Sequence, residues 1–284
     1  MPLPHPKRGP LLFALIGAAS LLVTTTGGCD PVTAKRATQQ FIPVEPGTKV
    51  DVRTQNGWIK VIQGRPGMVA ITTHRRASAL VGKKGLDQMK VRVKKVGGVL
   101  RIRGTHPTDP NQRRYQLNFV VKVPPRTKVT LRSARGDLRI FGAICDVDGE
   151  TRRGEVRAMN VEGTMKLRTQ AGNIFLVGQV PRFDVESALG DIRLSLDPAA
   201  KPLTGASRAV AKQGDISFTA GPRCGAQVTA RARAGAVKSE WPPESVKPHW
   251  LRTQLGTGAA TVSLLTHKGR IRIHKAANRV HKVQ

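Results

Sequence analysis

The chain has 284 residues, a length that fits one large domain or two ordinary ones. Only 4% of the residues are aromatic, against 39% that are hydrophobic, which excludes a core built on aromatic rings and leaves burial to Val, Ile and Leu. The formal net charge of +30 points to a polyanionic partner, such as nucleic acid, anionic lipid headgroups or an acidic polysaccharide.

The first 28 residues have the layout of an export signal. Lys7 and Arg8 precede the apolar run LLFALIGAASLLV, and the small residues of TTTGGC lead to Cys29. The run is too short for an ordinary spanning helix, so we interpret residues 1–28 as a signal peptide. The small residues before the cysteine resemble the lipobox of bacterial lipoproteins, with Thr26 in place of the usual Leu, and this implies a lipidated Cys29. The alternative is a plain secretory peptide that is cleaved nearby.

Export narrows the choice of polyanion. A secreted chain rarely meets cytoplasmic nucleic acid, so we expect no specific nucleic-acid partner and a location in the bacterial cell envelope. The expected partners are the membrane, through a lipid anchor, and an acidic polysaccharide, lipopolysaccharide or other envelope polyanion. The sequence does not indicate a protein partner, and it does not specify the membrane leaflet.

The segment after the signal is predicted to be a tether followed by an irregular β region. Three prolines, the first at Pro31 and the last at Pro46, mark residues 29–45 as the tether, and residues 46–125 form the β region. Within it, MKVRVKKVGGVLRIRG predicts a hairpin that turns at Gly97-Gly98. The alternating segment YQLNFVVKV predicts a strand with one buried face. That face consists of Tyr115, Leu117, Phe119, Val121 and Val123.

A glycine motif recurs through the rest of the chain and has one earlier copy. The copies include LRSARGDLRI, ETRRGEVRA, LRTQAGNIFL and VESALGDIRL, whose glycines are separated by three consecutive spacings of 18 residues. Self-similarity at a fixed period indicates a repeat architecture. The glycines that define the copies are Gly57, Gly136, Gly154, Gly172, Gly190, Gly214, Gly235 and Gly269.

All copies share one internal pattern. The positions seven before, two after and four after the glycine are almost all apolar, and the position three before it is Thr, Ser or Ala. Apolar residues spaced by two predict a strand with one buried face on each side of a turn, where glycine permits a positive φ angle. Strand pairs that cannot bury their own face favour a β-solenoid of stacked repeats of about 18 residues. The alternative is an antiparallel meander in which each glycine closes a hairpin.

These motifs resemble a known family. VKVPPRTKVTLRSARGDLRIFG, the glycine repeats and the closing TVSLLTHKGRIRIHK are similar to the bacterial putative-adhesin family of envelope proteins, over roughly residues 46–275. The resemblance implies an all-β fold of the β-solenoid kind and brings no catalytic residues with it. The strongly basic charge of this chain departs from the usual pattern of that family.

The remaining segments complete the predicted organisation. Regular copies occupy residues 126–239, and they are followed by a Pro-rich insertion at 240–250, closing strands at 251–275 and a basic tail at 276–284. One copy contains Arg135-Gly136-Asp137, a tripeptide that adhesive proteins present to cell-surface receptors. Its sibling copies read Arg-Gly-Glu, Ala-Gly-Asn and Leu-Gly-Asp at the same place, so we interpret the tripeptide as a structural turn.

The sequence predicts a protein with no catalytic or metal site. An acid follows the glycine in four copies, and in three of them an arginine two residues further on neutralises it. These acids are Asp137, Glu155, Asp191 and Asp215. His267 and His274 flank one turn among Lys and Arg residues, which repel a metal cation. We therefore expect a non-enzymatic protein without a cofactor. The alternatives are a polysaccharide-cleaving enzyme on the same fold, which needs clustered carboxylates, and an envelope sensor or assembly subunit.

The basic residues of the hairpin are the candidate binding site. Like charges at strand spacing are unfavourable unless acids or a ligand screen them, and the nearest acid along the hairpin strands is Asp87. The predicted polyanion-binding residues are Lys90, Arg92, Lys94, Arg101 and Arg103. The alternative is a generally basic, soluble surface without a specific ligand.

Overall fold

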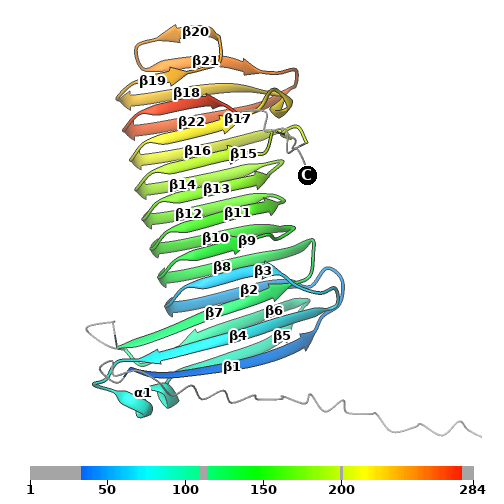
Figure 1. Ribbon diagram of the computed structural model, residues 1–284, viewed down its shortest axis with the longest axis vertical. Helices are drawn as coiled ribbons and strands as arrows, with labels where there is room; N and C mark the ends of the chain where they lie inside the picture. The colour runs from blue at the N-terminus through cyan, green and yellow to red at the C-terminus, as the bar shows by residue number, and fades with distance from the viewer. Residues whose placement is uncertain (1–32, 109–113, 199–200, 277–284) are drawn as a thin grey trace, which may run out of the picture.

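Two large mixed sheets face each other along the length of the protein in the computed structural model, which describes residues 33–108, 114–198 and 201–276 (Figure 1). Sheet I, in spatial order, consists of β1 (Ala34–Pro43), β4 (Met68–Ala77), β7 (Tyr115–Val123), β3 (Ile59–Gln63), β9 (Leu138–Phe141), β11 (Val156–Glu162), β13 (Ile174–Gln179), β15 (Ile192–Leu196), β17 (Ile216–Ala220), β23 (Ile271–Lys275) and β19 (Val237–Ser239).

Sheet II runs alongside sheet I. In spatial order it consists of β20 (Pro243–Lys247), β21 (Trp250–Leu255), β18 (Ala226–Ala234), β22 (Ala260–Lys268), β16 (Ala206–Gln213), β14 (Phe183–Leu189), β12 (Met165–Ala171), β10 (Cys145–Arg153), β8 (Thr127–Arg135), β2 (Lys49–Asn56), β6 (Val99–Thr105) and β5 (Lys90–Val96). The helices in the described part of the chain are α1 (Gly82–Gln88) and a 3-10 turn at Pro222–Cys224. The predicted all-β class is confirmed.

The two strands that flank each repeat glycine lie in different sheets. Around Gly154, β10 belongs to sheet II and β11 to sheet I, and each pairs in parallel with the corresponding strands of the neighbouring copies. The register follows the sequence period, because Val147 aligns with Met165 and Val156 aligns with Ile174. The antiparallel meander is therefore wrong for these copies, since a hairpin would pair the two flanking strands with each other.

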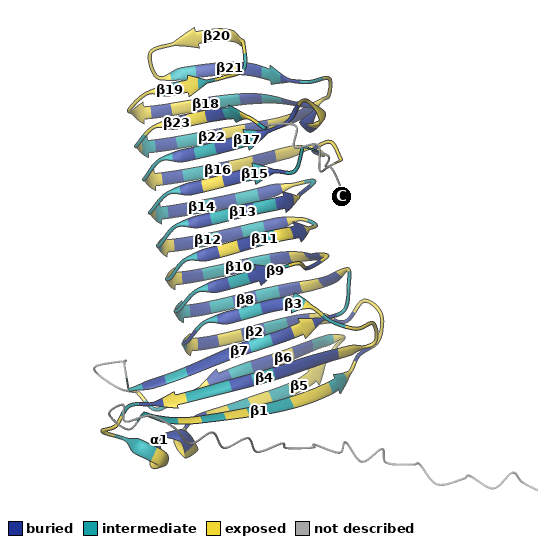
Figure 2. Cartoon of the chain, viewed as in Figure 1, coloured by how far each residue is buried: buried dark blue, intermediate teal, exposed yellow. Residues whose placement is uncertain are grey.

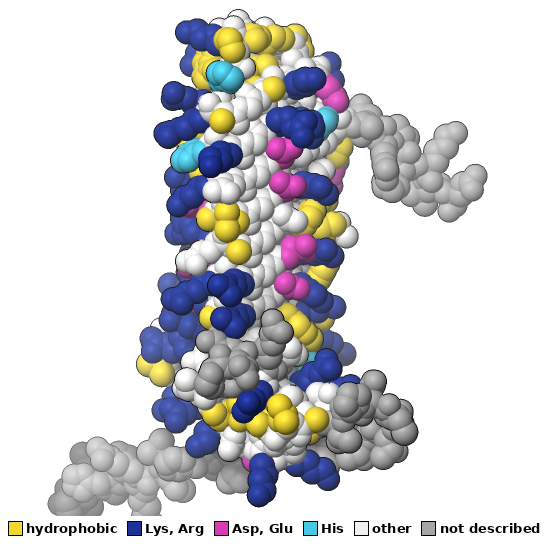
Figure 3. Space-filling model, turned by 90° about the vertical axis from the view of Figure 1, so that its left-hand side faces the viewer, with side chains coloured by type: hydrophobic (Ala, Val, Ile, Leu, Met, Phe, Trp, Pro, Cys, Tyr) yellow, Lys and Arg dark blue, Asp and Glu magenta, His cyan; other side chains and the backbone are white. Residues whose placement is uncertain are grey.

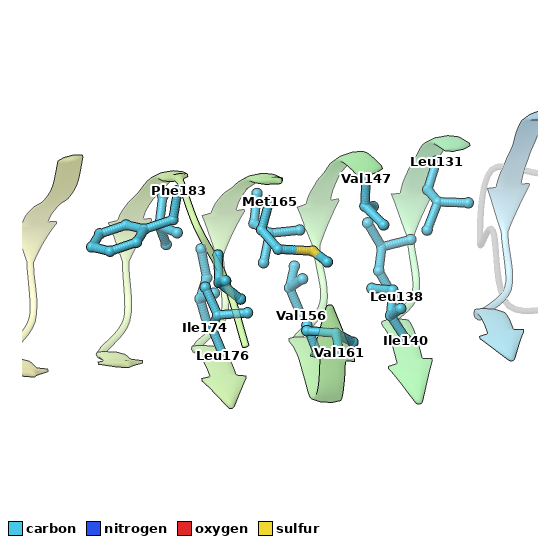
Figure 4. Close-up of a cluster of buried hydrophobic side chains, with 14 of the residues drawn as sticks. Leu131, Leu138, Ile140, Val147, Val156, Val161, Met165, Ile174, Leu176 and Phe183 are labelled. Atoms are coloured by element: carbon cyan, nitrogen blue, oxygen red, sulfur yellow. The ribbon is translucent and has the colours of Figure 1, made fainter. Parts of the chain in front are cut away.

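Buried residues alternate with more exposed ones along the repeat strands, as the spacing by two residues predicted (Figure 2). Ile174 and Leu176, two and four residues after their glycine, both have an exposed fraction of 0%. Leu138, Met165 and Phe183 point into one continuous cluster from both sheets (Figure 4). Aliphatic side chains thus supply most of the core, which agrees with the low aromatic content.

The order of the copies in space differs from their order in the sequence. β22 pairs with β16 on one side and with β18 on the other, and β23 likewise lies between β17 and β19. The Gly269 copy is therefore inserted between the Gly214 and Gly235 copies. At the other end, the Gly57 copy pairs directly with the Gly136 copy through β2–β8 and β3–β9. The sequence order had suggested that residues 251–275 close the molecule. They do not do so by themselves, because β18 and β19 lie beyond β22 and β23 in the two sheets.

The N-terminal region is more ordered than the sequence predicted. Residues 34–43, which we expected within the tether, form β1, which pairs antiparallel with β4 along its whole length. The hairpin around Gly97-Gly98 is confirmed as the β5–β6 pair, and the buried face of β7 is confirmed from Tyr115 to Val123. Helix α1 was not predicted, because its short sequence contains two glycines and lacks a side-chain N-cap.

The C-terminal insertion also forms structure. β20 and β21 continue sheet II with antiparallel pairing beyond β18. β20 lies within the predicted Pro-rich insertion, and β21, almost all of which lies in the predicted closing strands, covers the edge of β18. The signal peptide, Cys29 and residues 277–284 of the tail lie outside the described residues. Among the residues that the structure describes, no helix has the length and apolar character to cross a membrane.

Candidate polyanion-binding surface

The five predicted residues share the outer face of sheet II at its N-terminal end. Val91 and Val93 of β5 pack against the core, so the alternating Lys90, Arg92 and Lys94 project outward. The pairing with β6 places Arg92 opposite Arg103 and Lys94 opposite Arg101. Like charges directly opposite one another destabilise a strand pair. The β5–β6 register nevertheless brings all five residues together. We call Lys90, Arg92, Lys94, Arg101 and Arg103 the basic cluster.

An aspartate from a third strand screens one side of the basic cluster. β2 pairs in parallel with β6, and the guanidinium of Arg103 donates hydrogen bonds of 3.0 and 2.7 Å to the carboxylate of Asp51. Arg53 lies 3.2 Å from the same carboxylate. Burial raises the pKa of Asp51, but hydrogen bonds from Arg103 and Arg53 outweigh it and hold the pKa below its usual value. The expectation that no acid comes within reach is thus wrong for Arg103.

The other four residues of the cluster keep their charge unpaired. Lys90, Arg92, Lys94 and Arg101 are exposed and form no ion pair within the described part of the chain. β5 is also the outermost strand of sheet II, where lysines oppose edge-to-edge aggregation. Protection of this edge is the structural alternative to ligand binding, and both follow from the same exposed charge.

The middle of the same face is electrically balanced. Arg132 contacts Asp148 at 3.0 Å and Glu150 at 3.4 Å, and Arg168 contacts Asp184 at 3.1 Å. These pairs join neighbouring strands, because each arginine lies beside the acids of the next copy. The basic cluster therefore differs from the middle of this face in its lack of counter-ions.

The positive charge of the arginines on the outer face of sheet I is also largely neutralised by neighbouring groups. Arg139 contacts Asp137 at 2.8 Å, and Arg157 pairs with Glu155, as predicted. The third predicted pair is wrong, because Arg193 lies over the ring of Phe175, 5.4 Å from its centroid, and Asp191 instead accepts the backbone N–H of Asp215. Lys and Arg border the pale column of glycine turns, and carboxylates gather along one border (Figure 3). Arg139, Arg157 and Arg193 thus already have partners.

The acids after the glycines also connect the copies. The Oδ1 atom of Asp137 accepts the backbone N–H of Glu155 at 3.0 Å, and that of Asp191 accepts the N–H of Asp215 at 2.9 Å. Asp137, which belongs to the Arg-Gly-Asp tripeptide, is therefore engaged by both Arg139 and the neighbouring turn. This double engagement agrees with the structural interpretation of the tripeptide.

A second ladder explains the residue three before each glycine. The hydroxyl of Thr169 donates to the carbonyl oxygen of Gly154 at 3.0 Å, and the hydroxyl of Ser187 donates to that of Gly172 at the same distance. The glycines leave no space for a side chain, since a Cβ on Gly172 would lie 2.0 Å from the Gly154 oxygen. The sequence pattern showed a small residue here, and the hydrogen bond adds the reason for a hydroxyl.

A pocket of about 280 Å³ lies on the side of the protein away from the glycine turns. Its lining includes the carboxylates Asp146 and Glu162, the cation Arg126 and the buried Cys145. Asp146 accepts the backbone N–H of Thr164 at 2.9 Å, which is the same role that Asp137 has at the glycine turns. Within the described residues, no group of three or more His, Cys, Asp or Glu side chains could hold a metal ion.

No family model matches the chain, and no curated protein matches it. Solved structures do resemble it. A putative adhesin of Bacteroides fragilis NCTC 9343 has 15% identity and a TM-score of 0.49, over 84% of this chain and 97% of its own. A putative cell adhesion protein of Clostridium sporogenes ATCC 15579 has 10% identity and a TM-score of 0.40, over 84% of this chain and 100% of its own. The predicted resemblance to proteins called adhesins is confirmed.

Proposed function

We propose that this protein is an exported, non-enzymatic envelope protein that binds a polyanion through the basic cluster, as an adhesin or surface scaffold. Its body is a β-solenoid, in which parallel pairing at the repeat period buries the apolar face of each copy against the next. Cys29 carries the lipid that holds the protein to the membrane. The observation that supports binding is the group of four exposed cations without an ion pair in the described chain, namely Lys90, Arg92, Lys94 and Arg101.

The geometry of the cluster suits a repeating anion. Alternate residues of a strand lie about 7 Å apart on one face, which is similar to the charge spacing of many acidic polymers. β5 and β6 offer two such rows side by side, because Arg92 and Lys94 stand opposite Arg103 and Arg101. A bound polyanion would replace the missing counter-ions, so binding is electrostatic and tolerant of the sugar or headgroup that carries the charge.

Replacing the whole basic cluster with Gln should abolish retention on a heparin or lipopolysaccharide matrix at low salt. Wild-type protein should be retained there and released steeply as the salt concentration approaches the physiological range, because binding releases counter-ions. The matched control replaces Arg139, Arg157 and Arg193 with Gln, and these arginines already contact acids or a ring. An equal loss of retention per removed cation in both variants would show that only net charge acts, and the basic-surface alternative would then hold.

The polysaccharide-cleaving alternative has one supporting observation, the presence of Asp146 and Glu162 in the same pocket. We expect these carboxylates to be structural, because Asp146 already holds a turn through Thr164. The purified protein should release no reducing ends from acidic or neutral polysaccharides, and the double variant Asp146→Asn and Glu162→Gln should behave identically. Product formation that disappears in the double variant would establish the enzyme and overturn the non-enzymatic proposal.

A further inference from the structure

The basic cluster lies at the end of the protein where the chain enters the fold. β1, which begins at Ala34, is the outermost strand of sheet I, and β5 is the outermost strand of sheet II at the same end (Figure 1). Arg36 of β1 contacts Asp87 of α1 at 2.8 Å. The start of β1 therefore lies beside the helix that directly precedes β5 in the sequence.

Positive charge is concentrated at this end. Residues 33–123 contain 19 Lys and Arg against 4 Asp and Glu, whereas residues 124–239 contain 19 against 11. Three of the four acids already pair with cations of the same region, namely Glu45, Asp51 and Asp87. Lys83 and Lys84 of α1 are exposed next to the point where β1 begins, and they extend the basic cluster around the end of the protein.

Exposed apolar side chains accompany this charge. Of the seven large hydrophobic side chains that are exposed in the described residues, four belong to the elements of this end. They are Phe41 on β1, Met68 on β4, Leu80 before α1 and Val96 on β5. Leu80 is the most exposed of all, at 82%. Phe41 and Met68 lie on sheet I and the basic cluster lies on sheet II, so apolar and basic side chains surround this end from both sheets. Exposed apolar side chains together with basic residues are typical of protein surfaces that lie at a membrane interface.

We propose that this end docks on the anionic phospholipid headgroups of the membrane that anchors the protein. The inference rests on the proposed function and names its polyanion as a lipid surface. A lipidated Cys29 would precede Ala34 by five residues, a span of at most about 18 Å when fully extended. The tether therefore brings this end, and no other, to the bilayer surface, where each Lys or Arg gains from the negative surface potential. The exposed apolar side chains then enter the headgroup layer.

Vesicle binding by the unlipidated protein tests the proposal. The processed chain that begins at residue 29, with Cys29→Ser, should co-sediment with vesicles of phosphatidylcholine plus phosphatidylglycerol and not with phosphatidylcholine alone. Replacing Lys90, Arg92, Lys94 and Arg101 with Gln should weaken this binding on the order of several hundredfold, at about fivefold for each cation near the surface. The matched control replaces four exposed cations of the opposite end and should bind nearly as wild type. They are Lys212, Arg231, Arg233 and Lys247.

A fluorescent thiol label tests the orientation on the same vesicles. Cys145 and Cys224 are buried, and burial raises the pKa of both thiols to about 12, so they do not compete for the label. An environment-sensitive dye on Leu80→Cys should shift its emission to shorter wavelength when phosphatidylglycerol vesicles are added. The same dye on Val246→Cys, at the opposite end and 60% exposed in the native residue, should not shift.

The outcomes separate this proposal from the proposed function. Retention on heparin that depends on the cluster, without binding to anionic vesicles, would overturn membrane docking and leave a polysaccharide as the ligand. If the wild-type protein is neither retained on heparin nor bound by anionic vesicles, both proposals are overturned. Vesicle binding that is equally weakened by the far-end variant, or a shift of the Val246→Cys label as large as that of Leu80→Cys, would overturn docking by this end. Circular dichroism of each variant confirms that the β-sheet content is unchanged.

Discussion

Replacing Ile192 with Asp should unfold the protein, whereas replacing the adjacent Arg193 with Ser should leave the fold intact. Ile192 has an exposed fraction of 0% and aligns with Ile174 and Ile216 of the neighbouring strands, so a carboxylate there would be buried among aliphatic side chains. Burying an unpaired charge costs several kcal/mol, a large share of the roughly 5–15 kcal/mol that stabilises a typical domain. Thermal unfolding followed by circular dichroism measures both effects.

The two residues are a matched pair because they are adjacent on β15 and face opposite sides of the sheet. Arg193 is exposed and lies over the ring of Phe175, so its loss should change the melting temperature little. Ile192→Val, which removes one methyl group, should cost about 1 kcal/mol and shows whether the site senses packing as well as charge. Similar melting temperatures for Ile192→Asp and Arg193→Ser would mean that the assigned inner face of β15 is wrong.

The glycine period was sufficient to predict the strands of the regular copies and their buried faces. Ile174 and Leu176 show why, since their spacing by two and their distance from Gly172 recur in every copy, and both are fully buried. The pattern failed where local sequence does not determine the neighbours of a strand. β22 pairs with β16 although another copy separates them in the chain, and no residue within β22 indicates this insertion.

At the candidate site too, the sequence predicted the features that neighbouring residues determine and missed those that depend on residues far apart in the chain. The alternation of Lys90, Arg92 and Lys94 was visible in the sequence, and the hairpin register that gathers the cluster followed from Gly97-Gly98. The ion pair between Arg103 and Asp51 could not be predicted, because its partners are 52 residues apart on parallel strands. Likewise, β1 reads as a tether in isolation, and its strand conformation depends on pairing with β4.

The repeat glycines should be the least replaceable residues of the protein, and Gly172→Ala should destabilise it by more than about 4 kcal/mol. Its φ angle of +151° lies outside the conformations that L-residues adopt readily. An added Cβ would lie 2.0 Å from the carbonyl oxygen of Gly154 and 2.6 Å from its carbon, so the obstacle is backbone that a side-chain rotation cannot move. Chemical denaturation followed by circular dichroism measures the loss.

The control for this effect is Gly205→Ala, which separates steric contact from backbone preference. Gly205 has a φ angle of +65°, in the left-handed region, and an added Cβ would meet nothing within 4 Å. Its replacement should therefore cost only the conformational penalty of about 1–2 kcal/mol. The ladder gives Gly172→Ala a further cost, because displacing this turn also disturbs the hydrogen bond from Ser187 to the Gly172 carbonyl. If both variants lose the same small amount of stability, close backbone contact between neighbouring turns is not what requires glycine, and the turns must be free to separate.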